Sequence, residues 1–81
     1  MSAVILPYPQ VRRHGFVARQ ARHMARLSPE ASDRYLARIM DTTHATLLRK
    51  GVSPALADRE ARALANAIRA SLYGLMLNGI A

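Results

Sequence analysis

The side chains best suited to chemistry in this chain are arginines gathered near its N-terminus. The first 27 residues hold five of them and no acidic residue: Arg12, Arg13, Arg19, Arg22 and Arg26. A guanidinium presents N–H donors in a planar fork that pairs with two oxygens of a phosphate or carboxylate. The cluster therefore predicts contact with an anionic partner.

Their spacing would place four of these arginines on one side of a helix. Arg12 and Arg19 are seven residues apart, as are Arg19 and Arg26, and seven residues return a helix to nearly the same angle. At ~1.5 Å per residue the stripe would be about 20 Å long, with Arg13 pointing away from it. The candidate residues for binding nucleic acid or an acidic partner are Arg12, Arg19, Arg22, His23 and Arg26.

Other reactive side chains form no recognisable site. Asp41 and His44 lie three residues apart around two threonines, which we interpret as a polar patch on a helix, with Thr43 in the core stripe. The three histidines lack metal-ligand spacing, there is no cysteine, and no Gly-rich phosphate loop is present. We expect no metal, no cofactor, no small-molecule substrate and no enzymatic activity.

Two regions are expected along the chain: an extended leader over residues 1–10 and a single helical domain over 11–81. Pro7 and Pro9 disfavour a helix in the leader. Its apolar side chains, Ile5, Leu6 and Tyr8, either pack on the domain or dock on a partner.

The helical domain is predicted to be all-α, with three antiparallel helices at about 11–27, 29–50 and 54–78. Ser-Pro pairs at 28–29 and 53–54 combine a good N-cap with a residue suited to the first helical position. Gly51 and Gly79 are the expected C-caps. The short connections favour helices that fold back on one another.

Residues near the C-terminus are too apolar for one small core to bury. A chain of 81 residues forms a small core, and without disulfides the remaining common source of stability is association. Large exposed apolar patches generally mark interaction sites. We expect self-association or a partner interface formed by Leu72, Tyr73, Leu75, Met76, Leu77 and Ile80, with the leader residues Ile5, Leu6 and Tyr8.

The formal net charge of +7 narrows the choice of partner without deciding it. The arginine stripe favours a nucleic-acid backbone, with binding that weakens in salt. The alternatives are an adaptor or inhibitor on an acidic host protein, of phage or mobile-element origin, a structural homo-oligomer, and a basic face that is merely solvated. The alanine-rich apolar face of the first helix is too weak for stable membrane binding. No segment looks like a membrane span or a signal peptide, so a cytoplasmic location is expected.

Two stretches give the chain a family likeness. One is Ile5-Leu6-Pro7-Tyr8-Pro9 followed by Arg12-Arg13, Phe16, Met24 and Ser28-Pro29-Glu30. The other is Arg49-Lys50-Gly51-Val52-Ser53-Pro54 followed by Asp58-Arg59-Glu60 and the arginines of the last helix. The chain resembles a family of short, basic, uncharacterised alpha-proteobacterial and phage proteins, although Leu72-Tyr73-Gly74 replaces their Trp-containing apolar segment. The resemblance implies a bacterial, cytoplasmic, non-enzymatic protein and supplies no site residues.

Overall fold

The chain folds into helices alone over the part that the structure describes. The computed structural model describes residues 9–80, and for the last two of these the backbone only. It contains a 3-10 helix, η1 (Gln10–Arg12), and three α-helices: α1 (His14–Met24), α2 (Pro29–Arg49) and α3 (Pro54–Ile80). No strand occurs among these residues, so the all-α prediction is confirmed.

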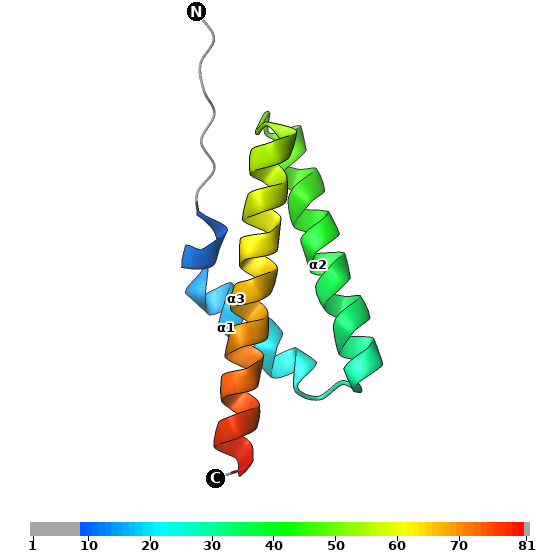
Figure 1. Ribbon diagram of the computed structural model, residues 1–81, viewed down its shortest axis with the longest axis vertical. Coiled ribbons are helices and arrows are strands. Elements are labelled where there is room, and N and C mark those ends of the chain that lie inside the picture. The colour runs from blue at the N-terminus through cyan, green and yellow to red at the C-terminus, as the bar shows by residue number, and fades with distance from the viewer. Residues whose placement is uncertain (1–8, 81) are drawn as a thin grey trace, which may run out of the picture.

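Helices α2 and α3 form an antiparallel hairpin, with their starts capped as the sequence predicts (Figure 1). The Ser28 hydroxyl accepts a hydrogen bond from the Ala31 N–H at 3.2 Å, and the Ser53 hydroxyl accepts one from the Leu56 N–H at 3.4 Å. Each bond satisfies a donor that the first turn of a helix otherwise leaves free.

The turn of the hairpin is a Schellman motif built on Gly51. Gly51 has φ 92°, which a residue with a Cβ adopts only with strain. Its N–H donates to the Leu48 carbonyl and the Val52 N–H donates to the Leu47 carbonyl, both at 3.0 Å. Leu47, Val52 and Ala57 then pack into a small apolar cluster, the hydrophobic contact that accompanies this motif.

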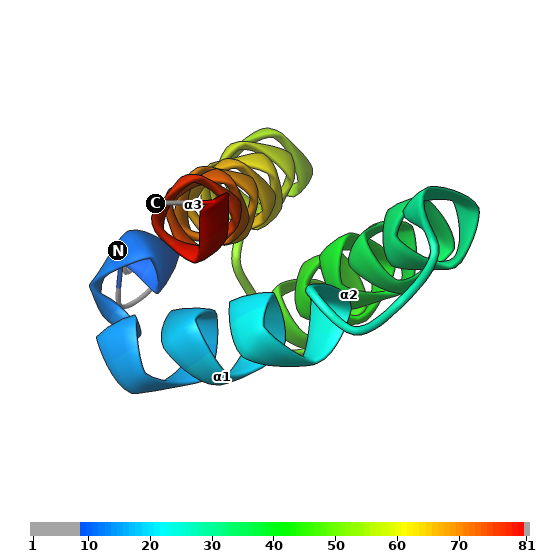
Figure 2. The same ribbon diagram turned by 90° about the horizontal axis from the view of Figure 1, so that it is seen from below.

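Helix α1 is shorter than predicted and lies across the hairpin. It spans His14–Met24 instead of 11–27, because the chain forms η1 before it and turns toward α2 after it. Figure 2 is seen from below and shows α3 strongly foreshortened, α2 inclined to it, and α1 running crosswise from beside α3 toward α2. The antiparallel arrangement therefore describes α2 and α3, while α1 packs mainly on α3 and meets α2 at Tyr35.

The main core lies where the three α-helices meet. Leu64 and Ile68 of α3 are fully buried at its centre. The remaining buried members come from α1 (Val17, Ala21, Met24), α2 (Leu36) and α3 (Ala65, Leu72). Alanines among them let the helices approach closely, and the long α3 contributes to every part of the core.

Helix α3 continues beyond the rest of the molecule at its C-terminal end. It runs to Ile80, so Gly79 lies inside the helix and the C-cap predicted there is wrong. In Figure 1 this end of α3 projects past the start of α2 and past the turn after α1. Within the described part of the chain, no neighbouring helix therefore covers the last turns of α3.

Candidate anion-binding surface

The outer face of α1 carries two arginines opposite the core. Val17, Ala21 and Met24 are the buried residues of α1, and Arg19 and Arg22 lie on the opposite side of the helix, where both are exposed. Neither makes an ion pair or a side-chain hydrogen bond with any described residue. Their guanidinium groups are therefore available to an external anion.

The other two arginines of the predicted stripe are exposed but lie outside α1. Arg12 belongs to η1, and Arg26 lies in the turn that follows Met24. A continuous stripe with a seven-residue repeat needs one helix from 12 to 26, so that geometry is wrong. The break has a local cause, since Arg13, between η1 and α1, has φ −79° and ψ 61°, outside the helical region.

His23 is exposed, but its ring also helps to join α1 to α2. The centroids of the His23 and Tyr35 rings are 4.7 Å apart, with the ring planes inclined by 47°. The Tyr35 hydroxyl donates a 2.6 Å hydrogen bond to the Gln20 Oε1. His23 therefore has a packing role that its place in the stripe did not predict.

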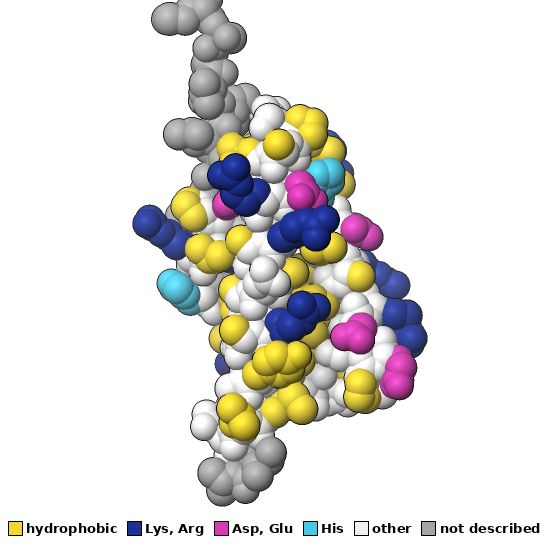
Figure 3. Space-filling model, viewed as in Figure 1, with side chains coloured by type: hydrophobic (Ala, Val, Ile, Leu, Met, Phe, Trp, Pro, Cys, Tyr) yellow, Lys and Arg dark blue, Asp and Glu magenta, His cyan; other side chains and the backbone are white. Residues whose placement is uncertain are grey.

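Acidic residues are confined to the hairpin. All five, Glu30, Asp33, Asp41, Asp58 and Glu60, lie on α2 and α3. Among the described residues there is one ion pair, in which the Arg62 Nε donates to the Asp58 Oδ2 at 2.9 Å. The face of the hairpin seen in Figure 3 accordingly carries both signs of charge, whereas α1 carries only positive charge.

Glu60 is already engaged by the segment that precedes α1. Its Oε1 accepts a 3.0 Å hydrogen bond from the backbone N–H of Gln10, whose side chain is 8% exposed. This bond ties η1 to the second turn of α3.

Arg13 is held in a different environment from its neighbours. Its Nη1 donates to the Gln10 Oε1 at 3.0 Å, and its Cζ lies 4.0 Å from the centroid of the Phe16 ring. A guanidinium stacked on an aromatic face and bonded at one nitrogen is fixed in orientation.

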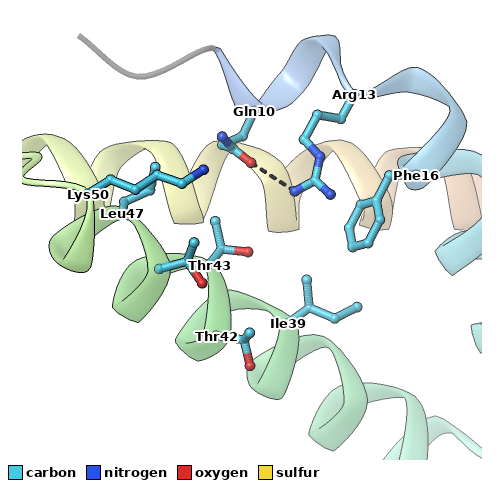
Figure 4. Close-up of a pocket in the computed structure, with 9 residues that line it drawn as sticks. Gln10, Arg13, Phe16, Ile39, Thr42, Thr43, Leu47 and Lys50 are labelled. Carbon is cyan, nitrogen blue, oxygen red and sulfur yellow. Dashed lines mark hydrogen bonds between the residues drawn. The ribbon is translucent and has the colours of Figure 1, made fainter. Parts of the chain in front are cut away.

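Arg13 faces a cleft between the η1–α1 segment and the C-terminal half of α2. Figure 4 shows Arg13 and Phe16 on one wall, with Ile39, Thr42 and Thr43 across from them. The cleft has a volume of about 600 Å³. None of its lining residues is acidic: Gln10, Arg13, Phe16, Ile39, Thr42, Thr43, Thr46, Leu47 and Lys50.

Sequence reasoning missed this cleft because its walls are about thirty residues apart in the chain. The one available signal was Thr43, a hydroxyl at a position of the apolar stripe of α2.

The C-terminal end of α3 exposes four of the nine apolar residues predicted to form an interface. Tyr73, Leu75, Met76 and Leu77 are 38–69% exposed. Leu72 is 9% exposed and belongs to the core, although it also lines the groove at this end of α3. Ile5, Leu6, Tyr8 and the side chain of Ile80 lie outside the described part of the chain.

A groove of about 210 Å³ adjoins this end of α3. Met24, Leu27, Pro29, Leu36, Tyr73 and Met76 are among its lining residues. Figure 3 shows apolar side chains gathered at the same end of the molecule, over the last turns of α3 and the start of α2.

Residues 9–80 contain neither a cluster of metal-binding side chains nor a helix suited to crossing a membrane. No group of three or more histidine or acidic side chains is placed to hold a metal ion there. No helix of this region combines the length and apolar character needed to cross a membrane.

Comparison with known proteins finds one match. The family model described as "Family of unknown function (DUF6074)" matches residues 1–80. No curated protein and no solved structure matches the chain. The opening motif and the bacterial origin implied by the resemblance remain predictions.

Proposed function

We propose that this chain, which belongs to the family of unknown function DUF6074, binds the phosphate backbone of nucleic acid through the outer face of α1. The observation that carries the proposal is that Arg19 and Arg22 are exposed with no carboxylate partner among the described residues. Arg12 and Arg26 are exposed in the segments that flank α1 and add two further positive charges close to it in the chain.

Phosphate is the anion that this surface suits best. A nucleic acid offers a row of phosphates to several separate arginines, and each arginine can pair with one of them without a continuous stripe. Among the described residues of this surface, no phenylalanine, tyrosine or tryptophan is exposed for base stacking, so contacts to the backbone would dominate. Binding of this kind has little sequence preference and a strong dependence on salt.

The test is a mobility-shift titration of a 20-base-pair duplex at several salt concentrations. Four phosphate contacts predict that the affinity falls about a hundredfold between 50 and 200 mM salt. The double variant R19E/R22E should abolish binding at 150 mM salt. Binding that ignores salt would contradict the proposal.

A matched control is available on α2. Arg34 and Arg38 are exposed, and they lie among the acidic residues Asp33 and Asp41. The variant R34E/R38E changes the net charge equally and should retain most of the binding. Equal loss in both variants would assign the effect to net charge rather than to α1.

A second candidate function, self-association, is favoured by the exposed end of α3. Residues 71–81 contain no charged side chain in a chain of net charge +7, so two copies can approach there with the least repulsion. Leu75 continues the core-facing stripe of Leu64, Ile68 and Leu72 past the end of the other helices. The last turns of α3 from a second copy would cover Leu75 and the neighbouring groove.

Sedimentation equilibrium tests this association over micromolar to millimolar protein. A dimer is expected for the native chain and a monomer for L75D/M76D. The control A70D adds a charge at an exposed position of α3 that precedes Leu75 by about one turn, and it should remain dimeric. A native chain that stays monomeric throughout would contradict the second candidate.

A further inference from the structure

We infer that the cleft between the η1–α1 segment and α2 binds a phosphate monoester with an apolar or aromatic body. This site is separate from the outer face of α1, and the inference does not rest on nucleic-acid binding. It replaces the expectation from the sequence that the chain takes no small molecule.

Two positive side chains supply the charge of the site. Arg13 uses one N–H on Gln10 and has no other hydrogen-bond acceptor among the described residues, so its other donors remain free. In Figure 4, Lys50 extends from the end of α2 toward Gln10 at the same cleft. Because none of the lining residues is acidic, nothing in the wall offsets these charges.

Thr43 provides an independent sign that the cleft lacks a polar partner. Thr43 is 8% exposed, and its hydroxyl has no hydrogen-bond partner among the described residues. In the described region, every side-chain nitrogen or oxygen that is fully buried has a hydrogen-bond partner. Because the Thr43 hydroxyl has none, it is not fully buried and is accessible from the cleft that Thr43 lines. A buried hydroxyl normally has a partner, and a ligand oxygen in the cleft would supply one.

Two more hydroxyls belong to the same wall. Thr42 and Thr46 lie one residue before and three residues after Thr43 and line the same cleft. The Thr46 Oγ1 accepts a 3.2 Å hydrogen bond from Arg49, which leaves its own O–H free to donate. The site thus combines two cations with three hydroxyl donors.

This donor set fits a phosphate ester better than a carboxylate. A phosphate monoester carries a charge of about −1.5 to −2 and three acceptor oxygens, whereas a carboxylate offers one charge and two oxygens.

The size and the remaining lining of the cleft account for the body of the ligand. A volume of about 600 Å³ lies within the range of small-molecule sites and far exceeds a phosphate group. Phe16, Ile39 and Leu47 give the cleft an apolar surface beside its donors. A phosphate ester would bind its phosphate to the donors and pack its organic group against these apolar side chains.

The experiment is a ¹H–¹⁵N NMR titration of the full chain with phenyl phosphate, at 150 mM salt. Saturable shifts are expected for amides of residues 10–16 and 42–50. Inorganic phosphate should bind more weakly and phenol should not bind measurably. If inorganic phosphate binds as tightly as the ester, or phenol shifts the same amides as strongly, the assignment of a phosphate ester is overturned.

Two variants examine the two walls. R13Q should weaken phenyl phosphate binding by about tenfold or more, and the nearly isosteric T43V by about threefold to tenfold. R38Q removes the same charge from the outer face of α2 and should leave the affinity within about twofold. Unchanged affinity in both R13Q and T43V, or an equal loss in R38Q, overturns the proposal.

The outcome is distinguishable from that of the duplex experiment. R19E/R22E should keep its phenyl phosphate shifts while losing the duplex, and T43V should do the reverse. Loss of phenyl phosphate binding in R19E/R22E to the same extent as in R13Q would show that the cleft has no specific role.

Discussion

Arg13 differs from Arg19 and Arg22 in how firmly its guanidinium group is held. Arg13 is bonded to Gln10 and stacked on Phe16, so its orientation is fixed before any ligand arrives. Arg19 and Arg22 have no such partners among the described residues and keep their rotamer freedom. A fixed guanidinium loses less entropy on binding and suits a specific ligand, whereas free ones suit a partner with many equivalent charges.

At the same scale, Tyr35→Phe tests the contact between α1 and α2. The variant keeps the ring beside His23 but removes the hydroxyl that donates to Gln20. It should lower the free energy of unfolding by about 0.5–1.5 kcal/mol, measured by urea denaturation. Tyr73→Phe, at an exposed tyrosine, is the control and should change it by less than about 0.5 kcal/mol. Equal effects of the two variants would mean that the hydrogen bond contributes nothing.

At the scale of elements, the features that could be predicted are those set by a few consecutive residues. Ser28, Ser53 and Gly51 cap the helices as expected because capping uses backbone groups within one turn. The end of α1 at Met24 could not be predicted in this way. Residues 25–27 are compatible with a helix, and the chain leaves it there as it turns to enter α2.

The two candidate anion-binding sites differ in how far the sequence alone predicts them. Exposure of Arg19 and Arg22 follows from their positions opposite Val17 and Ala21 within one helix. The cleft depends on Arg13 meeting Thr43, which no local pattern encodes. Burial of Leu72 likewise depends on where α1 and α2 end relative to α3.

Replacing Gly74 or Gly51 with alanine should change the thermal stability in opposite directions. A Cβ added at Gly74, inside α3, meets no atom within 4 Å, so Gly74→Ala should stabilise the helix by about 0.5–1 kcal/mol and raise the Tm by roughly 2–8 °C. Gly51→Ala should lower the Tm because φ is 92° there. Thermal unfolding followed by circular dichroism measures both. A lower Tm for Gly74→Ala would contradict the account of α3.

At the scale of the whole molecule, the charges are unevenly distributed. Twelve basic side chains face five acidic ones, and one ion pair joins them among the described residues. The acids neutralise part of the hairpin, α1 keeps an excess of positive charge, and the end of α3 has no charge. The outer face of α1 therefore suits an anion, the end of α3 suits an apolar contact, and the face of the hairpin carries both signs of charge.

Salt should consequently stabilise the folded chain while weakening its hold on nucleic acid. Screening reduces repulsion among exposed arginines, so the Tm should rise by a few degrees between 10 and 150 mM sodium chloride. Scanning calorimetry at fixed protein concentration measures this rise. The variant R19Q/R22Q removes two of the repelling charges, so its Tm should rise less with salt than that of the native chain. A Tm that falls with salt would contradict the view that repulsion exceeds attraction.

The tight turn between α2 and α3 also bears on the order in which the molecule assembles. Only Lys50 to Ser53 separate the two helices, and the cluster of Leu47, Val52 and Ala57 packs next to this turn, so its contacts close a short loop. Local contacts of this kind favour rapid formation, and the uncapped α1 depends on the hairpin for its apolar support. We expect the hairpin to dominate the folding transition state, with substitutions at Gly51 slowing folding and substitutions in α1 mainly accelerating unfolding.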